Sequence, residues 1–581
     1  MSFGITAPSG KGGSREKTMN KKRLSSLWLV FVAWTVLAPA AASAGAGEER
    51  SPEGCTVIGV GRLATVDGSV FTSHTDCCSE CRVHVVPGRT FKNGDLAPVH
   101  WGMVYFGKDD DRECLLLGNY GKVIGHIPQV EKTFTYFHTG YSQMNEHQLA
   151  IGESTCSQKP ALDVAFMEGV TKQIMTIEQA QVFALERCRT AREALKLITS
   201  LVETYGFLPS CGGSEALCIA DPKEVWVLEV FSVGPEWEPG SEKPGAVWAA
   251  RRVPDDHLVV ISNYVRIREI DLEDPDFLAS TNYMQEAIDR GWYDPKSGLP
   301  FIWQDAYAPR IKEGNLSRLW LIYSTVAPSL REWPRRKLSG SSSPFTMYGQ
   351  DLEGAAFYPF SVKPEKKISV KDIIGFQRSA FEGTIYDMAA DPAWLVPGPQ
   401  DRVVRSPLTT PFASPELKKL LRIASHRTIA TQGYGMVAQL RGWLPDPVGG
   451  IYWFYVDNPY VSAYVPIYAG VRDVSPYYKN YDYARFSEDS ARWMVDFVEK
   501  LLHLRWQEAV KDLRAARDPL EEGFFASQPE VEAKALKLHE KNPAEAVKYL
   551  TELTISRMND VVKMFRSLRD LLLTKYSGDI V

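Results

Sequence analysis

A strand, a tight turn and a second strand follow one another between residues 55 and 73. The apolar run CTVIGVG at 55–61 precedes the turn VDGS at 66–69, and VFTS at 70–73 follows it. An Asp-Gly pair between two β-prone runs is a strong hairpin signal. We therefore expect Cys55 to open the first strand of a sheet.

The rest of the chain alternates between strand-rich and helix-rich regions. Helical periodicity runs through 161–203 and again through about 487–577. This order favours stacked sheets with helices outside them over alternating βαβ units. Further strands are expected at 102–106, 148–152, 216–220, 225–230, 246–251 and 258–262.

The N-terminal region has the three parts of a signal peptide. A basic run at 19–23 precedes an apolar stretch at 24–37, and Ala-Ser-Ala at 42–44 fits a cleavage site. The apolar stretch is shorter than the roughly 20 residues of a membrane span. We expect an exported protein, periplasmic or secreted, with no membrane association after cleavage; a retained anchor is the alternative.

The segments on either side of this signal peptide are not expected to belong to the folded protein. Residues 1–18 are interpreted as a disordered lead or a misassigned start. Residues 45–54 are polar and contain Gly and Pro, which is typical of a cleavable propeptide or spacer.

Charge and cysteine usage limit the possible partners. The net charge is -5 and no long basic run occurs, so nucleic acid is not expected as a partner. All nine cysteines lie in the first 218 residues. Setting Cys55 aside leaves eight, which permits four disulfides in an exported protein, with the connectivity open.

One cluster of cysteines could bind zinc, or it could form disulfides or remain as free thiols. Cys78 and Cys81 have the spacing of half a zinc site, with Cys77 adjacent and His74 and His84 nearby. No second compact pair follows, so we expect disulfides or free thiols and no metal. No phosphate loop occurs, and no cofactor is expected.

Cys55 follows directly after the cleavable spacer. If the peptide bond before it is cut, its own α-amine becomes a base beside the thiol, so one residue combines nucleophile and base. Two alternatives stay open from this context. Cys55 could form a disulfide, or it could be lipidated, although Pro52-Glu53-Gly54 is a poor lipidation motif.

Several blocks of sequence resemble, in order, the N-terminal-nucleophile cysteine dipeptidases, the dipeptidase A and secernin group. This group is distantly similar to penicillin V acylase and bile salt hydrolase. The block at 144–153 has Gln148 where the family has Gly. The matching blocks lie at 55–69, 144–153, 247–264, 361–364, 381–384, 439–445 and 465–470.

The resemblance implies an α+β fold, the four-layered αββα N-terminal-nucleophile hydrolase fold. The hydrolase domain is expected over 55–485, and a helical C-terminal region over 486–581 is expected to pack on it. The implied activity is hydrolysis of dipeptides or short peptides through a thioester, with a peptide or small amide as substrate. An acylase or amidase that cleaves N-acyl amides, and a non-catalytic exported binding protein with Cys55 in a disulfide, are the alternatives. A homo-oligomer is possible.

The resemblance also assigns the reacting groups. Cys55 is the implied nucleophile, and Asp76 matches an Asp that hydrogen-bonds the α-amine, although it could instead cap a turn. Asn145 and Asn263 match two positions that line the oxyanion site, where a side-chain amide is a suitable donor; a turn role competes for Asn145.

Two further positions are expected near this site. Arg318 matches an Arg that stabilises the site of the acylase relatives; a surface helix Arg is the alternative. His74 stands two residues before Asp76, where the family usually has Arg. His74 is therefore a candidate substrate-contact residue that lacks the fork of a guanidinium.

Overall fold

The computed structural model describes part of the chain, and every described residue belongs to the contact unit Glu53–Val581. The expectations for the lead, the signal peptide and residues 45–53 lie outside the described residues and stay predictions. The described residues are 54–76, 80–104, 121–308, 311–331, 351–352, 358–384, 386–387, 394–398, 400, 402–406 and 433–577.

A seven-stranded sheet contains the expected hairpin, with strand order β16-β12-β1-β2-β19-β20-β21. β1 and β2 pair antiparallel, with Gly59 opposite Thr72, and Gly68 in the connecting turn has a φ of 85°. The hairpin prediction is confirmed. The strands are β1 (Val57–Val60), β2 (Val70–Asp76), β12 (Leu258–Ile261), β16 (Ser361–Val362), β19 (Tyr434–Leu440), β20 (Ile451–Val456) and β21 (Val465–Tyr468).

An eight-stranded sheet has the order β13-β11-β10-β9-β8-β7-β6-β3. All its pairings are antiparallel. Its strands are β3 (His84–Val86), β6 (Tyr136–His138), β7 (Met144–Asn145), β8 (Ala150–Cys156), β9 (Ser214–Ala220), β10 (Val225–Ser232), β11 (Ala246–Val253) and β13 (Phe277–Ala279).

The expected strands from 148 to 262 are confirmed as β8 to β12, with shifts at their ends. The strand expected at 102–106 is wrong over residues 102–104, which form none. The strand lies earlier, as β4 (Leu96–His100), and Gly102 has a φ of 61°, which turns the backbone out of an extended path. Residues 105–106 lie outside the described residues.

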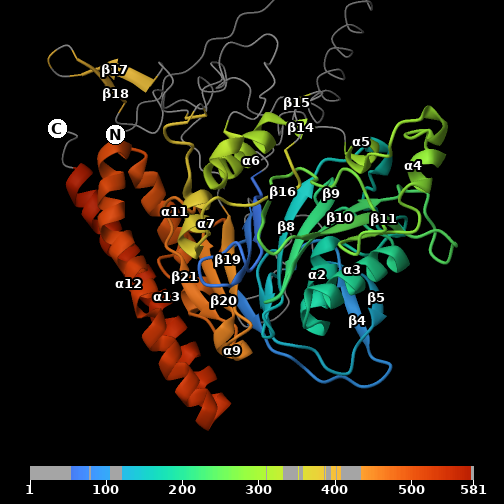
Figure 1. The fold of residues 1–581 in the computed structure, drawn as a ribbon. Coiled ribbons are helices and arrows are strands. Elements are labelled where there is room, and N and C mark those ends of the chain that lie inside the picture. The colour runs from blue at the N-terminus through green and yellow to red at the C-terminus, as the bar shows by residue number, and fades with distance from the viewer. Residues whose placement is uncertain are drawn as a thin grey trace, which may run out of the picture. The chain divides into compact units, whose positions relative to one another are not determined.

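The two large sheets face each other, because β1 and β2 contact β8 and β9 (Figure 1). The side chains of β9 alternate between two cores. Ala216, Cys218 and Ala220 join the core that contains the β1–β2 hairpin. Leu217 and Ile219 point the opposite way, into a core shared with the next two helices.

α2 (Ile177–Arg187) and α3 (Ala191–Tyr205) pack over the eight-stranded sheet. Thr176 caps α2, and Thr190 forms a capping box with Glu193 at the start of α3. The helical periodicity is confirmed for these two helices, whereas residues 163–176 contain no helix.

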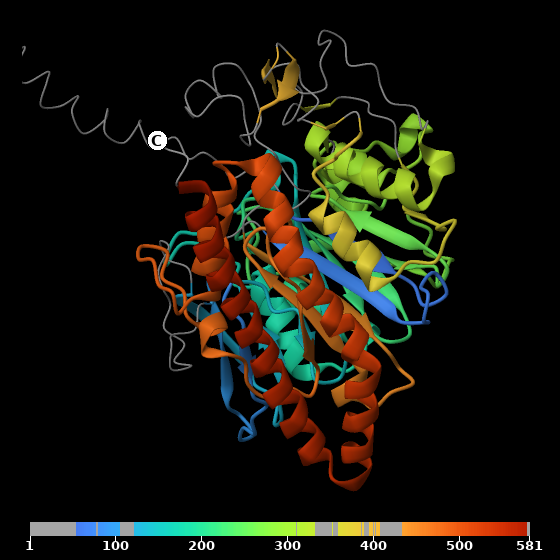
Figure 2. The ribbon, with the colours of Figure 1, turned by 90° about the vertical axis from the view of Figure 1, so that its left-hand side faces the viewer.

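A second group of helices lies on the side of the seven-stranded sheet (Figure 2). These are α6 (Glu313–Val326), α7 (Val370–Arg378), α11 (Ala491–Leu502), α12 (Trp506–Lys541) and α13 (Pro543–Ser577). α12 and α13 pack on each other, and both contact β21. The helical prediction for the C-terminal region is confirmed.

Smaller elements complete the described chain, which has an α+β fold of antiparallel sheets and helices. Among the described residues, no helix is both long enough and apolar enough to cross a membrane. The smaller elements are β5 (Val123–Pro128), β14 (Ile311–Lys312), β15 (Asp351–Leu352), β17 (Leu395–Pro397), β18 (Val403–Arg405), α4 (Gln285–Asp289), α5 (Trp303–Tyr307), α9 (Asp446–Gly449), α10 (Pro476–Lys479), η1 (Pro160–Leu162), η2 (Pro295–Ser297) and η3 (Pro328–Leu330).

Candidate functional site

Cys55 is buried and lies two residues before β1, so it precedes the first strand and does not open it as expected. Side chains of β2 bridge to the backbone beside it. The main-chain N–H of Thr56 donates to Thr75 Oγ1 at 2.8 Å, and that of Ile58 donates to Ser73 Oγ at 3.0 Å. These bonds hold the start of β1 against the end of β2, the strand that Asp76 closes.

Thr75 also contacts the residue that precedes Cys55. Its hydroxyl donates to the carbonyl oxygen of Gly54 at 3.1 Å, and the carbonyl oxygen of Thr56 lies 3.4 Å away. The Gly54–Cys55 peptide bond is therefore held beside the Thr75 hydroxyl. No sequence pattern indicates this role, because Thr is common in strands.

Arg318, on α6, links Cys55 to Asn263. One terminal nitrogen, Nη1, donates to the main-chain oxygen of Cys55 and to Thr56 Oγ1. The other, Nη2, donates to the main-chain oxygen of Ser262 at 3.0 Å and to Asn263 Oδ1 at 2.8 Å. Nε donates to Gly314 O at 2.8 Å. All five guanidinium hydrogens are thus used, so Arg318 positions its neighbours from a buried site.

Asn263 follows β12 and is fixed by three contacts. Its main-chain N–H donates to Ser154 Oγ at 2.9 Å, and its Nδ2 donates to Thr155 O at 2.8 Å. Because Arg318 donates to Oδ1, the orientation of the amide is defined. Nδ2 carries two hydrogens, so one remains for a further acceptor. Asn263 also has a φ of 57°, which an Asn tolerates better than most residues.

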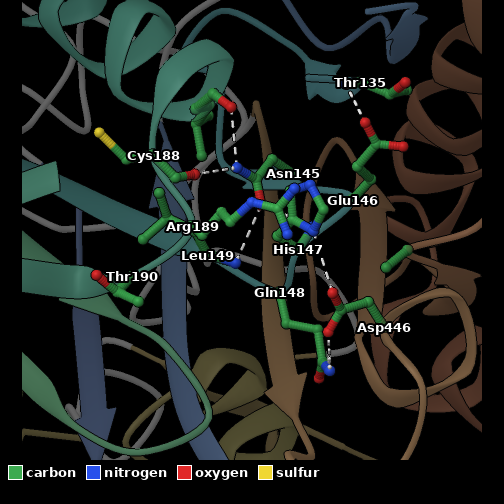
Figure 3. Close-up of polar contacts among 12 residues, drawn as sticks. Thr135, Asn145, Glu146, His147, Gln148, Leu149, Cys188, Arg189, Thr190 and Asp446 are labelled. Atoms are coloured by element: carbon green, nitrogen blue, oxygen red, sulfur yellow. Dashed lines mark hydrogen bonds and ion pairs between the residues drawn. The ribbon is translucent and has the colours of Figure 1, made fainter. Parts of the chain in front are cut away.

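Asn145 has a different environment from the one expected (Figure 3). Its Nδ2 donates to the main-chain oxygens of Leu185 and Cys188, each at 2.9 Å, at the C-terminal end of α2. Its Oδ1 accepts from the main-chain N–H groups of His147 and Leu149. Both amide hydrogens are used, so this side chain offers none to an oxyanion here. The geometry supports a structural role at the end of a helix, where carbonyl groups need donors.

Gln148, which stands where the family has Gly, has a backbone conformation that is unusual for a residue with a side chain. Gln148 has a φ of 62°, a conformation that favours glycine. Its side chain compensates: Oε1 accepts from the main-chain N–H of Arg441 at 2.8 Å, and Nε2 donates to Asp446 Oδ1 at 3.1 Å. Asp446 also contacts His147 Nδ1 at 3.1 Å, as Figure 3 shows.

His74, on β2, is fully buried, and its ring is oriented by the neighbouring sheet. The main-chain N–H of Glu153 donates to His74 Nδ1 at 3.0 Å. Nδ1 therefore supplies a lone pair, and the ring carries its proton on Nε2. Nε2 lies 4.0 Å from Asp76 Oδ2 and has no hydrogen-bond partner within the described part of the chain.

Tyr455, on β20, is a buried residue that the sequence pattern did not single out. Burial raises the pKa of its phenol well above the ordinary value, and the charges of Tyr464, Asp76 and Cys55 add to the rise. Its hydroxyl has no hydrogen-bond partner among the described residues. A side chain at Gly435 would collide with that hydroxyl, so the glycine leaves room for it.

Cys188 and Cys218 are poor nucleophiles. Burial raises the pKa of Cys188 to about 12 and that of Cys218 to about 12, so both stay protonated. Cys81, Cys188, Cys211 and Cys218 carry free thiols, so none of them forms a disulfide. Cys77, Cys78 and Cys114 lie outside the described residues, and so does any zinc site or disulfide that uses them.

Comparisons with known proteins identify the family. The model of Peptidase family C69 matches residues 130–518, a region that Cys55 precedes. Probable dipeptidase B of Lactococcus lactis subsp. lactis (strain IL1403) is 24% identical over 445 residues, covering 74% of this chain and 78% of the relative. Dipeptidase A of Lactobacillus helveticus is 23% identical over 426 residues, covering 72% and 75%. Probable dipeptidase A of Streptococcus pyogenes serotype M3 (strain SSI-1) is 22% identical over 480 residues, covering 79% and 85%.

The matched region contains His147, Glu153, Asn263 and Arg318, and it ends inside α12. It covers more than half of the chain, and the relatives extend the likeness to about three quarters. The chain belongs to peptidase family C69 and is a peptidase.

Proposed function

We propose that this peptidase is an exported enzyme that hydrolyses dipeptides or short peptides with Cys55 as its N-terminal nucleophile. The observation that carries the proposal is the Arg318 link, which joins the main chain of Cys55 to the side chain of Asn263. One buried guanidinium thus holds both the main chain of the proposed nucleophile and the side-chain amide of the proposed oxyanion donor. The dipeptidase names of the relatives support the substrate class.

We infer that the fold is the four-layered αββα arrangement of N-terminal-nucleophile hydrolases. The facing sheets and the helices outside each of them support this inference. The hydrolase domain spans 55–485, and the helical region 486–581 packs on it through α11, α12 and α13.

Maturation exposes the nucleophile in this proposal. Residues 19–44 direct export, and cleavage between Gly54 and Cys55 removes the spacer 45–54. The new α-amine of Cys55 then lies beside its own thiol, with an ordinary pKa of about 7.7 to 8.0. Asp76, buried at the end of the adjacent strand, holds that amine and tunes its basicity.

The reaction then proceeds in two steps. The α-amine accepts the thiol proton, and Cys55 Sγ attacks the scissile carbonyl carbon. The unused Nδ2 hydrogen of Asn263 donates to the oxyanion. The protonated amine passes its proton to the leaving amine as the C–N bond breaks, which leaves a thioester. Water, deprotonated by the same amine, hydrolyses the thioester and releases the carboxylic acid.

His74 contacts the substrate through Nε2–H in this proposal. A neutral imidazole offers one donor there, whereas the usual Arg would offer a charged fork. That difference favours, as a second candidate, an acylase that accepts an uncharged N-acyl group. The two candidates are separated by the ratio of kcat/KM for a dipeptide to that for the matching N-acyl amino acid.

The decisive experiment combines N-terminal sequencing of the exported protein with assays of Cys55→Ala. We expect a mature chain that begins at Cys55, and a variant that folds but has no amide hydrolysis. Cys188→Ala is the matched control, because this thiol is also buried but lies at the end of α2. A mature chain with another first residue, or turnover by Cys55→Ala, would refute the mechanism.

A further inference from the structure

Three carboxyl groups are buried together beside the candidate site. Glu153 and Glu215 lie on adjacent strands, where Glu215 pairs with Thr155, and Glu178 lies in the first turn of α2. Their exposed fractions are 1%, 0% and 2%. We call these three residues the carboxyl cluster.

The carboxyl cluster has more acceptors than donors. Ser210 Oγ donates to Glu178 Oε1 at 2.6 Å, and Thr155 Oγ1 donates to Glu153 Oε1 at 3.2 Å. The Glu153 and Glu215 carboxyl groups lie close enough for the charge of Glu153 to act on Glu215. Within the described part of the chain, both oxygens of Glu215 and the Oε2 atoms of Glu153 and Glu178 have no hydrogen-bond partner.

No described Lys, Arg or His forms an ion pair with the carboxyl cluster. Burial raises the pKa of Glu178 to about 7. Burial also raises the pKa of Glu215 well above its usual value, and the charge of Glu153 adds to the rise. Burial therefore disfavours the ionised form of these carboxyl groups, and a cation bound beside them would favour it.

Two sets of contacts tie the cluster to the site around Cys55. The Glu153 main chain donates to His74, which lies two residues before Asp76. On the other side, Thr155 accepts from Asn263, and Asn263 accepts from Arg318. Asp76 is close enough that its charge, after burial, raises the pKa of Glu153.

Tyr141 and Cys211 lie near the carboxyl cluster, because the charges of Glu153 and Glu178 raise the pKa of both groups after burial. The Tyr141 hydroxyl and Cys211 Sγ are 3.2 Å apart, and the rings of Tyr141 and His74 are 5.7 Å apart. Tyr141 is buried, whereas Cys211 is exposed. Tyr141 thus contacts both His74 of the candidate site and the exposed residue Cys211.

A protonated amine matches this environment better than a metal ion does. An ammonium group supplies three hydrogen-bond donors and a positive charge, which are what the free carboxyl oxygens lack. A metal ion needs its ligand atoms gathered closely. Among the described residues, the side chains that gather this closely are Asp457, Asp496 and Glu499, which lie apart from this cluster.

We propose that Glu153, Glu178 and Glu215 form the subsite that accepts a protonated amine of the substrate. The proposal rests on the proposed function, because it assumes that Cys55 attacks the neighbouring carbonyl. The amine is either the α-ammonium of the peptide or a basic side chain of its first residue. Both have the same chemistry, and the choice of substrates distinguishes them.

The test uses Glu215→Gln and Glu153→Gln in the mature enzyme, because Gln reproduces the shape of a protonated Glu but cannot ionise. Kinetics are measured with Ala-Leu against propionyl-Leu, which lacks the α-amine, and with Lys-Leu against norleucyl-Leu, which lacks the side-chain amine. If the cluster binds the α-ammonium, we expect kcat/KM for Ala-Leu, Lys-Leu and norleucyl-Leu to fall by about tenfold to a hundredfold, the worth of a hydrogen bond to a charged group, while that for propionyl-Leu changes by less than about threefold. If the cluster binds the side-chain amine, only Lys-Leu should lose this much, and norleucyl-Leu should change by less than about threefold.

Glu229→Gln is the matched control. Glu229 is a buried carboxyl whose oxygens are partnered: Oε1 by the main-chain N–H groups of Arg266 and Ile267, and Oε2 by Trp303 Nε1. This variant should lower the melting temperature and leave both substrate ratios unchanged. A loss in the Ala-Leu pair identifies the α-ammonium, and a loss in the Lys-Leu pair identifies the side chain.

Unchanged ratios in both Glu variants would overturn the proposal and leave the cluster as protonated packing. A wild-type enzyme that hydrolyses none of the four substrates would instead refute the proposed function. In that case, titration calorimetry on the inactive Cys55→Ala variant tests the subsite. Ala-Leu should bind at least about tenfold more tightly than propionyl-Leu, or Lys-Leu more tightly than norleucyl-Leu, and this binding should release protons. Equal binding within both pairs would again overturn it.

Discussion

The main-chain N–H of Glu153 donates to Nδ1 of His74 at 3.0 Å, and this bond fixes which ring nitrogen carries the proton. His74 therefore presents Nε2–H toward Asp76 Oδ2, 4.0 Å away. One hydrogen bond between the two sheets thus leaves Nε2–H as the donor that the buried His74 ring offers.

Replacing His74 should affect both stability and turnover. In His74→Phe the Glu153 N–H loses its acceptor, which should cost about 1–3 kcal/mol in the free energy of unfolding. Loss of the Nε2–H donor should lower kcat/KM by about tenfold. Denaturant unfolding and steady-state kinetics measure the two effects. A kcat/KM equal to that of the wild type would contradict the proposed substrate contact.

The two asparagines should separate in function. Asn263→Ala removes the free amide donor, and we expect kcat to fall by about 10²–10³. Asn145→Ala removes two donors from the end of α2, so it should lower the free energy of unfolding by about 1–3 kcal/mol and leave kcat within about threefold. Equal kinetic losses in the two variants would restore Asn145 as an oxyanion donor.

Arg318→Lys should be severe despite the retained charge. Lysine has three donors on one nitrogen and cannot span the five acceptors that Arg318 contacts. We expect the melting temperature and kcat to fall together. Arg192→Lys, at an exposed ion pair, should change stability by less than about 0.5 kcal/mol and serves as the control. An Arg318→Lys enzyme with ordinary turnover would argue against the positioning role.

Substitutions at Gln148 should reveal backbone strain. Gln148→Ala and Gln148→Gly both lose the side-chain bonds to Arg441 and Asp446, but only glycine relaxes at a φ of 62°. Gln148→Gly should therefore be about 1 kcal/mol more stable than Gln148→Ala. Chemical denaturation of the two variants measures the difference, and equal stabilities would show that the backbone moves.

Stability should fall with rising pH through one buried carboxyl. Burial raises the pKa of Glu229 to about 7, compared with about 4.3 in an unfolded chain. The folded state then binds more protons than the unfolded state, so the contribution is full below about pH 4.3 and is lost as pH rises through about 7. Glu229→Gln removes this dependence, so its free energy of unfolding relative to the wild type should rise across that interval. Parallel curves for the two proteins would contradict the shifted pKa.

The alternation of apolar residues predicted β8 to β12 and the hairpin, because burial on a sheet face imposes a period of two on the sequence. Helical periodicity likewise predicted α2, α3 and the C-terminal helices. The strand expected at 102–106 failed at Gly102, because a short apolar run does not reveal a backbone turn.

By itself, the sequence determined local structure and the family. The order of its blocks pointed to cysteine dipeptidases, and the family C69 match agrees. Only the tertiary structure decided what each polar side chain does, because these hydrogen bonds join residues 79 and 109 positions apart in the chain. It joined Arg318 to Cys55, assigned both amide hydrogens of Asn145 to a helix end, and buried Glu153 with Glu215 beside His74. Residue type and spacing along the chain do not predict those contacts.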